Sequence, residues 1–298
     1  MQSGANDTSL HFDRWSTAIV GNAVDDRGHT AIDFASKHSS SIHTLIYDSK
    51  KLEIIFDGTR FVAEDIKDIV KPVIENTILL EATTLRITEI LLFLKAIKKL
   101  GYFKVSLLYL EPEYYRSPHR DHVLQRRDFE LSDNVEAFLG IPGSLIRLKD
   151  NPPTRAVFLL GYEGERLDRA LDETGIKPSK CSVVFGVPAF RPGWEMDSFA
   201  NNVNIIVERK IAQGILFAGA QNPLSAFESI KKVYDSCGDK ERLIIGPIGT
   251  KPHGIGAALF ACEYNNVGVI YDYPAKRQER SRHIGNWHLF NVDFDQSA

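Results

Sequence analysis

A glycine-rich stretch late in the chain combines residue types that could hold an anion. It reads Gly-Pro-Ile-Gly-Thr-Lys-Pro-His-Gly-Ile-Gly and spans residues 246–256. Its glycines permit tight turns, and the helix that we expect to follow would present its positive end. Thr250 adds a hydroxyl, Lys251 a compact positive charge and His253 a donor or acid–base group. We therefore predict contacts with a phosphorylated ligand at Gly249, Thr250, Lys251, His253 and Gly254.

The same stretch departs from the two best-known phosphate loops. It has neither the Gly-x-x-x-x-Gly-Lys-Ser/Thr spacing of a Walker A loop nor the Gly-x-Gly-x-x-Gly spacing of a dinucleotide-binding turn. A plain strand-to-helix turn with a solvated lysine is therefore the alternative. Its position favours a ligand site, because the loops that follow parallel strands are where α/β folds bind ligands.

A second candidate lies where another strand is expected to pass into a helix. Thr83 and Thr84 follow an apolar run, and Arg86 comes two residues later. The two hydroxyls could contact a ligand together with Arg86. The alternative is an ordinary helix cap with a surface charge.

A third strand-to-helix loop carries Glu163 and Glu165 next to Arg166. Paired carboxylates can do acid–base work, hold a metal or accept hydrogen bonds from a ribose hydroxyl. They also simply favour the positive end of a helix. Of the ligand roles we predict ribose contact, and we assign no metal ligand, no cofactor and no catalytic residue.

A basic run at residues 276–282 follows the strand after the glycine-rich stretch. Lys276 and Arg277 open this run, in which Glu279 is the single acid. Phosphate or single-strand contact is one interpretation, and a solvated or partner-facing loop is the other. We include Lys276 and Arg277 among the predicted ligand-binding residues, since they also follow a strand end.

One local resemblance bears on the ligand. The turn Gly249-Thr250-Lys251-Pro252, which leads into an alanine-rich helix, resembles the Gly-Gly-Thr-Lys turn of CRISPR-associated Rossmann-fold sensors. Ile248 stands where that turn has its first glycine. The resemblance implies a cyclic oligonucleotide ligand, a ligand-contacting loop at the Thr83–Thr84 position and a setting in prokaryotic antiviral defence.

Hydrophobic periodicity predicts the elements that position these loops. Strands are expected at residues 17–20, 44–47, 52–56, 77–80, 104–110, 156–161, 181–185, 215–218, 242–245, 267–271 and 287–292. Helices are expected at residues 62–75, 84–100, 164–174, 202–213, 223–236 and 255–263, and residues 25–29 are expected as a turn. This alternation predicts an α/β fold with Rossmann-like, three-layer parallel sheets in two units, 1–130 and 131–298, with a β-hairpin added near the N-terminus.

Composition narrows the classes of function. The formal net charge is −3 and the pI is near 6.3, which argues against general nucleic-acid binding. The three cysteines show no Cys-x-x-Cys spacing, so a reducing cytoplasm is the simplest compartment. No run is long and apolar enough for a membrane span. No Gly-x-Ser-x-Gly elbow is present, which argues against a serine hydrolase.

These features favour an intracellular protein that binds a nucleotide or another phosphorylated ligand, as a sensor or accessory subunit with a partner protein or as a homo-oligomer. An enzyme acting on a nucleotide or phosphorylated metabolite is the first alternative. Lys251 and His253 would then stabilise phosphate charge, and Glu163 or Glu165 would act as base. A structural subunit of a larger assembly is the second alternative.

Overall fold

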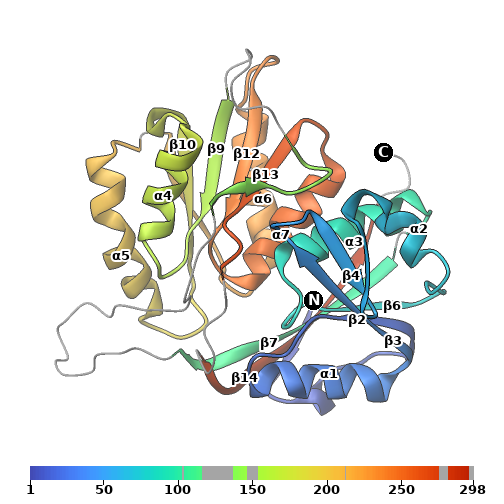
Figure 1. Cartoon of the computed structure of the whole chain (residues 1–298). Coiled ribbons are helices and arrows are strands. Elements are labelled where there is room, and N and C mark those ends of the chain that lie inside the picture. The colour runs from blue at the N-terminus through green and yellow to red at the C-terminus, as the bar shows by residue number, and fades with distance from the viewer. Residues whose placement is uncertain (103, 116–136, 146–153, 212, 275–280, 295–298) are drawn as a thin grey trace. The chain divides into compact units, whose positions relative to one another are not determined.

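The chain forms two compact α/β units in a computed structural model (Figure 1). The structure describes residues 1–298 except 103, 116–136, 146–153, 212, 275–280 and 295–298. Unit 1 consists of Met1–Arg116 and Lys276–Ala298, and unit 2 consists of Ser117–Ala275. The C-terminal segment therefore belongs to unit 1. The expected boundary at residue 130 lies outside the described residues.

Unit 1 is built on an eight-stranded sheet with the order β1-β14-β7-β6-β2-β3-β4-β5. Its strands are β1 (Gln2–Gly4), β2 (Trp15–Val20), β3 (Ser39–Asp48), β4 (Glu53–Phe56), β5 (Thr59–Val62), β6 (Ile78–Glu81), β7 (Lys104–Tyr115) and β14 (Ser281–Asp293). The central strands β7, β6, β2 and β3 are parallel, and the outer pairs are antiparallel.

The helices of unit 1 connect the parallel strands. They are α1 (Asp26–His38), α2 (Ile66–Val70) and α3 (Ile87–Lys99), with short 3₁₀ turns at Asp7–Ser9 and Ala63–Asp65. Helix α1 leads from β2 to β3, whereas α3 leads from β6 to β7 on the other side of β2. The two helices therefore cover opposite faces of the sheet (Figure 1). The strand order reverses between β2 and β6.

Unit 2 has a six-stranded sheet with the order β11-β10-β9-β12-β13-β8. Its strands are β8 (Leu139–Gly140), β9 (Thr154–Leu159), β10 (Cys181–Gly186), β11 (Gly214–Ala218), β12 (Arg242–Pro247) and β13 (Val267–Tyr271). All pairs are parallel except β13 with β8. The chain builds outward from β9 to β11 and then returns to build β12 and β13 on the other side, so the order reverses between β9 and β12.

Four helices connect the parallel strands of unit 2. They are α4 (Glu165–Thr174), α5 (Trp194–Glu208), α6 (Pro223–Asp235) and α7 (Lys251–Glu263), and a 3₁₀ turn covers Pro178–Lys180. Helix α4 packs on α5, and α6 packs on α7. The two pairs lie on opposite faces of the sheet (Figure 1). A buried cluster that includes Phe158, Leu167 and Ile206 joins the sheet to α4 and α5.

The structure corrects several boundaries that the sequence pattern predicted, among them the start of helix α7, which lies at Lys251 and not at residue 255. Residues 25–29, expected as a turn, form the start of helix α1. The helix expected at 62–75 is shortened to α2, because residue 62 pairs with β4 as part of β5 and residues 63–65 form a 3₁₀ turn. Helix α5 begins at Trp194, well before the expected residue 202. The mixed α/β class holds, with a largely parallel sheet in unit 2 and a sheet with a parallel centre and antiparallel edges in unit 1.

Candidate functional site

The loops that follow β2 and β6 meet at the strand-order reversal of unit 1. Gly21 directly follows β2 and lies against the loop after β6. Its N–H donates to Thr84 Oγ1 at 2.8 Å. A Cβ on Gly21 would lie 2.8 Å from the carbonyl carbon of Thr84. Only glycine permits this approach of two backbones. The two loops are therefore fixed to each other at their base.

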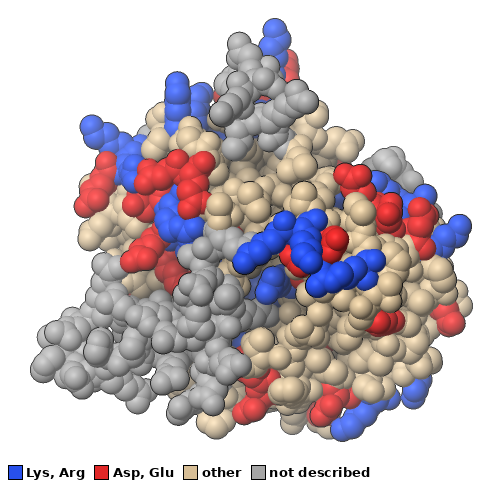
Figure 2. All heavy atoms as spheres, viewed as in Figure 1, with Lys and Arg blue, Asp and Glu red and all other residues tan. Residues whose placement is uncertain are grey.

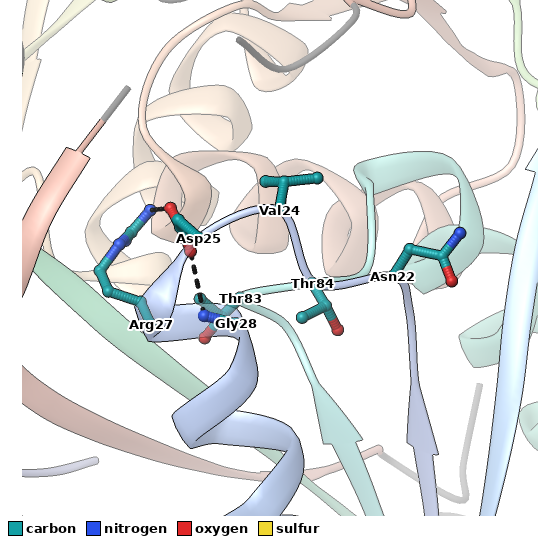
Figure 3. Close-up of a pocket in the computed structure, with 7 residues that line it drawn as sticks. All are labelled: Asn22, Val24, Asp25, Arg27, Gly28, Thr83 and Thr84. Carbon is teal, nitrogen blue, oxygen red and sulfur yellow. Dashed lines mark hydrogen bonds and ion pairs between the residues drawn. The ribbon is translucent and has the colours of Figure 1, made fainter. Parts of the chain in front are cut away.

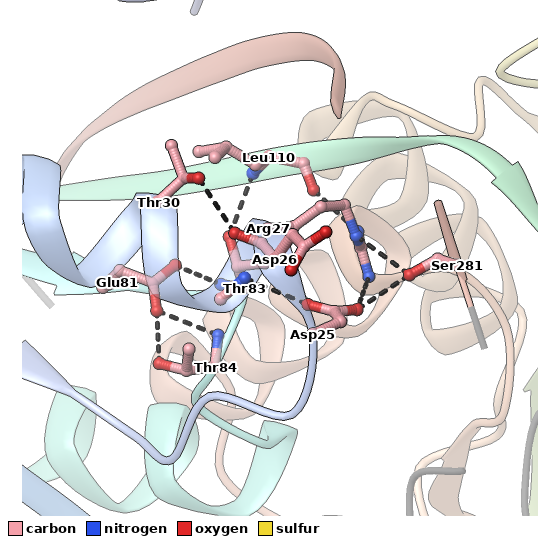
Figure 4. A network of polar contacts seen from close by, with 10 residues as sticks. Asp25, Asp26, Arg27, Thr30, Glu81, Thr83, Thr84, Leu110 and Ser281 are labelled. Carbon is pink, nitrogen blue, oxygen red and sulfur yellow. Dashed lines mark hydrogen bonds and ion pairs between the residues drawn. The ribbon is translucent and has the colours of Figure 1, made fainter. Parts of the chain in front are cut away.

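A fully buried carboxylate organises the second loop. Glu81 accepts the N–H groups of Thr83 at 2.7 Å and Thr84 at 2.9 Å, and it also accepts the Thr84 hydroxyl (Figure 4). Thr83 Oγ1 accepts the N–H of Leu110 at 3.0 Å. The structure thus places the predicted residues Thr83 and Thr84 at the reversal, where their first role is to shape the loop. Arg86, the third predicted residue here, is half-buried at the N-cap of α3.

A buried ion pair forms the opposite wall. Asp25 caps helix α1 by accepting the Gly28 N–H at 3.0 Å, and it binds Arg27 at 3.1 Å and the Ser281 hydroxyl at 2.7 Å. Burial alone would raise the pKa of Asp25, but the Arg27 charge and the hydrogen bonds hold the pKa below its usual value. Arg27 also donates to Ser281 and to the Leu110 carbonyl (Figure 4). The carboxylate is therefore ionised and fixed.

A small polar pocket lies between these two walls (Figure 3). It is lined by Asn22, Val24, Asp25, Arg27, Gly28, Thr83 and Thr84. The lining comes from the β2–α1 loop, the first turn of α1 and the β6–α3 loop. The pocket is partly open to solvent, and its enclosed part holds about one water-sized group. Ligands in open α/β sheets bind beyond the carboxyl ends of the strands where the order reverses, which is where this pocket lies.

The reversal of unit 2 brings together two of the predicted segments. A Cβ on Gly249 would lie 2.6 Å from the Leu160 carbonyl oxygen, and one on Gly161 would lie 3.0 Å from the Ile248 carbonyl oxygen. The glycine-rich loop therefore packs backbone against backbone on the loop after β9. Glu163, Glu165 and Arg166 belong to that second loop and the first turn of α4, so all these predicted residues lie at one edge of the sheet.

Arg166 is occupied by structural contacts at this edge. Its guanidinium binds the fully buried Asp272 carboxylate through two hydrogen bonds, at 2.5 and 2.8 Å, and donates to the Ile248 carbonyl at 2.9 Å. Glu163 lies 3.8 Å away. Burial alone would lower the pKa of Arg166, but Asp272 outweighs it and raises the pKa. This pair connects the start of α4 to the end of β13.

The polar groups of the glycine-rich loop are also engaged. Thr250 caps α7 by accepting the His253 N–H, and its hydroxyl donates to the Ala220 carbonyl at 2.7 Å. His253 is fully buried, with Nε2 at 3.1 Å from the Gly219 carbonyl oxygen. Burial lowers the pKa of His253 to about 4, so the imidazole is neutral at physiological pH. Gly254 is buried in the first turn of α7, and Lys251 is half-buried at its start.

The remaining predicted residues stand apart from this geometry. Lys276 and Arg277 lie outside the described residues, so their ligand role stays a prediction.

The sequence pattern did not predict Asp25 and Arg27 as site residues or helix α1 as a helix, because a run of Asp, Arg, Gly and His is also typical of a turn. Ala31, Phe34 and Ala35 follow at helical spacing and are buried, and this spacing after an Asp cap was the available signal.

Comparison with known proteins gave no matching family model and no matching curated protein. Among the described residues, no helix has the length and apolar character to cross a membrane. In the same part of the chain, no three His, Cys, Asp or Glu side chains gather as a metal-binding group. On the face shown in Figure 2, Lys and Arg are interspersed with Asp and Glu.

Proposed function

We propose that the protein binds a small phosphorylated ligand, of the nucleotide class, in the pocket at the β2–β6 reversal of unit 1. The observation that carries this proposal is the position and lining of the pocket. Both reversal loops and the first turn of α1 contribute to it, and charged and polar groups are already held in place there. Held groups favour binding, because the ligand does not have to order them.

The lining suits a ligand with hydroxyl and phosphate groups. Asp25 is an ionised acceptor suited to hydroxyls, and the exposed side chain of Asn22 offers both a donor and an acceptor. The Arg27 guanidinium also lines the pocket and offers the positive charge that a phosphate requires. A nucleotide presents both groups within a few bonds.

The size of the pocket limits how much ligand it holds. The enclosed part of the pocket holds about one water-sized group, which is far below the roughly 300–1,000 Å³ that encloses a drug-sized molecule. The pocket would therefore take one phosphate oxygen or one sugar hydroxyl of a nucleotide and leave the rest of the molecule outside.

The loops of unit 2 supply a second candidate place for the same class of ligand. Their strand order, β11-β10-β9-β12-β13, is the order of a Rossmann-like nucleotide-binding sheet, and the β9–β12 reversal carries Gly249, Thr250 and Lys251. The resemblance of this turn to CRISPR-associated Rossmann-fold sensors adds cyclic oligonucleotides to the ligands worth testing. A role as a cytoplasmic sensor in antiviral defence, with binding relayed to a partner or an oligomer, is part of the same proposal.

Thermal stabilisation by a ligand panel tests this function. The panel contains nucleoside mono-, di- and triphosphates, cyclic oligonucleotides and inorganic phosphate. A ligand present at 100 times its Kd would stabilise the fold by about 2.7 kcal/mol, which is a shift of several degrees in Tm. If no compound raises Tm at millimolar concentration, the proposal fails.

Matched variants locate the ligand. Asn22→Ala removes an exposed pocket side chain and should weaken binding about tenfold, the effect of one lost hydrogen bond. Asn204→Ala, an exposed asparagine on α5, is the control that should leave binding unchanged. A ligand whose affinity falls with Lys251→Ala instead of Asn22→Ala would place the site on unit 2.

A further inference from the structure

A serine, a histidine and a glutamate from three distant parts of the sequence form a hydrogen-bonded chain in unit 1. Ser3 Oγ lies 2.8 Å from His288 Nδ1, and His288 Nε2 lies 2.9 Å from Glu111 Oε2. Ser3 belongs to β1, Glu111 to β7 and His288 to β14, so three strands of one sheet supply one residue each. Although the sequence has no Gly-x-Ser-x-Gly elbow, we propose that these three residues form a hydrolytic triad that cleaves small carboxylic esters.

The hydrogen bonds fix the roles of the two ring nitrogens. The Glu111 oxygen is an acceptor, so His288 Nε2 carries the proton and donates to it. Nδ1 then holds a lone pair directed at Ser3, whose hydroxyl donates to it. A serine hydroxyl bound to a histidine that a carboxylate orients is the arrangement that activates a serine nucleophile. Here Nδ1 faces the serine and Nε2 faces the carboxylate, the reverse of the serine-protease triad.

Burial divides the three residues as this chemistry requires. His288 and Glu111 are 2% and 4% exposed, whereas Ser3 is exposed. Tyr109 and Phe290 stack on the imidazole, with ring centroids 6.1 and 5.9 Å away, and hold its plane. Ser3 and His288 also face each other in the β1–β14 register, so the backbone sets their separation.

The reaction balances with water as the second reactant. Ser3 Oγ attacks the ester carbonyl carbon while its proton passes to His288 Nδ1, and a bond forms between the serine oxygen and the acyl group. The bond to the leaving alcohol then breaks as that proton moves to the alcohol oxygen. Water attacks the acyl-serine by the same proton route, releases the carboxylic acid and restores Ser3.

Ser3 lies on the edge strand of the sheet, where its exposed hydroxyl can meet a small ester. β1 stands at the end of the strand order, with β14 as its neighbour in the described sheet. Because the proposal concerns β1, β7 and β14, it is independent of ligand binding at the pocket.

The test uses the full-length protein with a fluorophosphonate probe and with p-nitrophenyl acetate. We expect the probe to label Ser3, as mapped by mass spectrometry of the N-terminal peptide, and Ser3→Ala to lose both labelling and esterase activity. Ser106→Ala is the matched control. This serine of β7 donates to Asn291 Oδ1 at 2.9 Å and should leave both readouts unchanged.

Two further variants separate the base from the positioning residue. His288→Gln should slow labelling about 100-fold or more, since a general base contributes on that order. Glu111→Gln should lower kcat at least about tenfold with KM unchanged, because it disturbs the imidazole tautomer without touching the ester. Three results would overturn the proposal. They are absence of labelling, labelling that persists in Ser3→Ala, and a rate of Ser3 labelling that neither His288→Gln nor Glu111→Gln slows.

Discussion

The two strand-order reversals of this protein share a backbone device but differ in what occupies the space above it. In each unit a glycine lets the two loops touch: Gly21 against Thr84 in unit 1, and Gly249 against Leu160 in unit 2. Above that contact, unit 1 leaves a polar pocket beside Gly28. In unit 2 the third residue of the capped helix is His253, whose imidazole is completely buried.

This difference shows that a glycine-rich loop and a binding site are separate features. The glycines of unit 2 fit one loop against the other, and Arg166, which donates to the Ile248 carbonyl of the glycine-rich loop, is bound to Asp272. In unit 1 the loop after β2 is far poorer in glycine, yet it lines the pocket. A glycine in such a loop can be required by close packing of two backbones or by a bound ligand. Only the surrounding side chains distinguish these two causes.

The largest effect is expected from breaking the buried ion pair of unit 2. Asp272→Asn keeps the shape of the side chain but leaves the Arg166 guanidinium without its carboxylate. Removing one partner of a buried pair costs about 3–5 kcal/mol, so the free energy of unfolding should fall by that amount. Urea denaturation measures it. A loss below about 1 kcal/mol would mean that Glu163 and the Ile248 carbonyl are sufficient to stabilise the buried Arg166 guanidinium without Asp272.

A methyl group at the loop contact of unit 2 should have the next largest effect. Gly249→Ala would place a Cβ 2.6 Å from the Leu160 carbonyl oxygen, and neither backbone has room to move away. Overpacking of this kind costs roughly 1–3 kcal/mol. The control is Gly238→Ala, where the nearest atom is 4.0 Å away. Equal stability of the two variants, measured by urea denaturation, would contradict the tight contact.

The buried imidazole should make the stability of unit 2 depend on pH. Burial lowers the pKa of His253 from 6.5 to about 4, so the unfolded chain binds the extra proton first. The stability that the neutral ring confers is complete above pH 6.5 and is lost as the pH falls toward 4. The loss should reach roughly 2 kcal/mol by pH 5.

His253→Gln is the control for this pH dependence. It keeps an N–H donor for the Gly219 carbonyl and removes the titration. The difference in unfolding free energy between the parent and this variant, measured at pH 7.5 and pH 5, should therefore shrink by about the same 2 kcal/mol. A difference that stays constant would show that the folded state takes up the proton without cost.

The smallest effect on stability is expected where the pocket is filled. A Cβ on Gly28 would lie 3.0 Å from Ala23 Cα and 3.2 Å from Thr84 Cγ2. This crowding is offset by the gain of about 0.5–1 kcal/mol from replacing a helical glycine, so Gly28→Ala should change stability by less than about 1 kcal/mol. Ligand-induced stabilisation, measured by thermal shift, should nevertheless weaken. Unchanged ligand binding would remove this pocket as the site.

The sequence by itself determined the α/β class, most strands and the positions of the strand-to-helix loops. Period-two and period-3.6 patterns are local properties, so β6, β9 and α3 could be predicted from them. Helix α1 was missed because Asp, Arg and Gly at its first turn are also turn residues. The same patterns predict helices that pack on the sheet, but they do not predict the order of the strands within it.

Only the tertiary structure decided which side chains meet. Asp272 reaches Arg166 across more than a hundred residues, and Ser3, Glu111 and His288 come together because β1, β7 and β14 are neighbours in the sheet. No short motif signals such contacts, since strand pairing depends on the packing of the whole unit. The same packing occupies the predicted Thr250, His253 and Arg166 with internal hydrogen bonds, and it places the pocket beside the predicted Thr83 and Thr84.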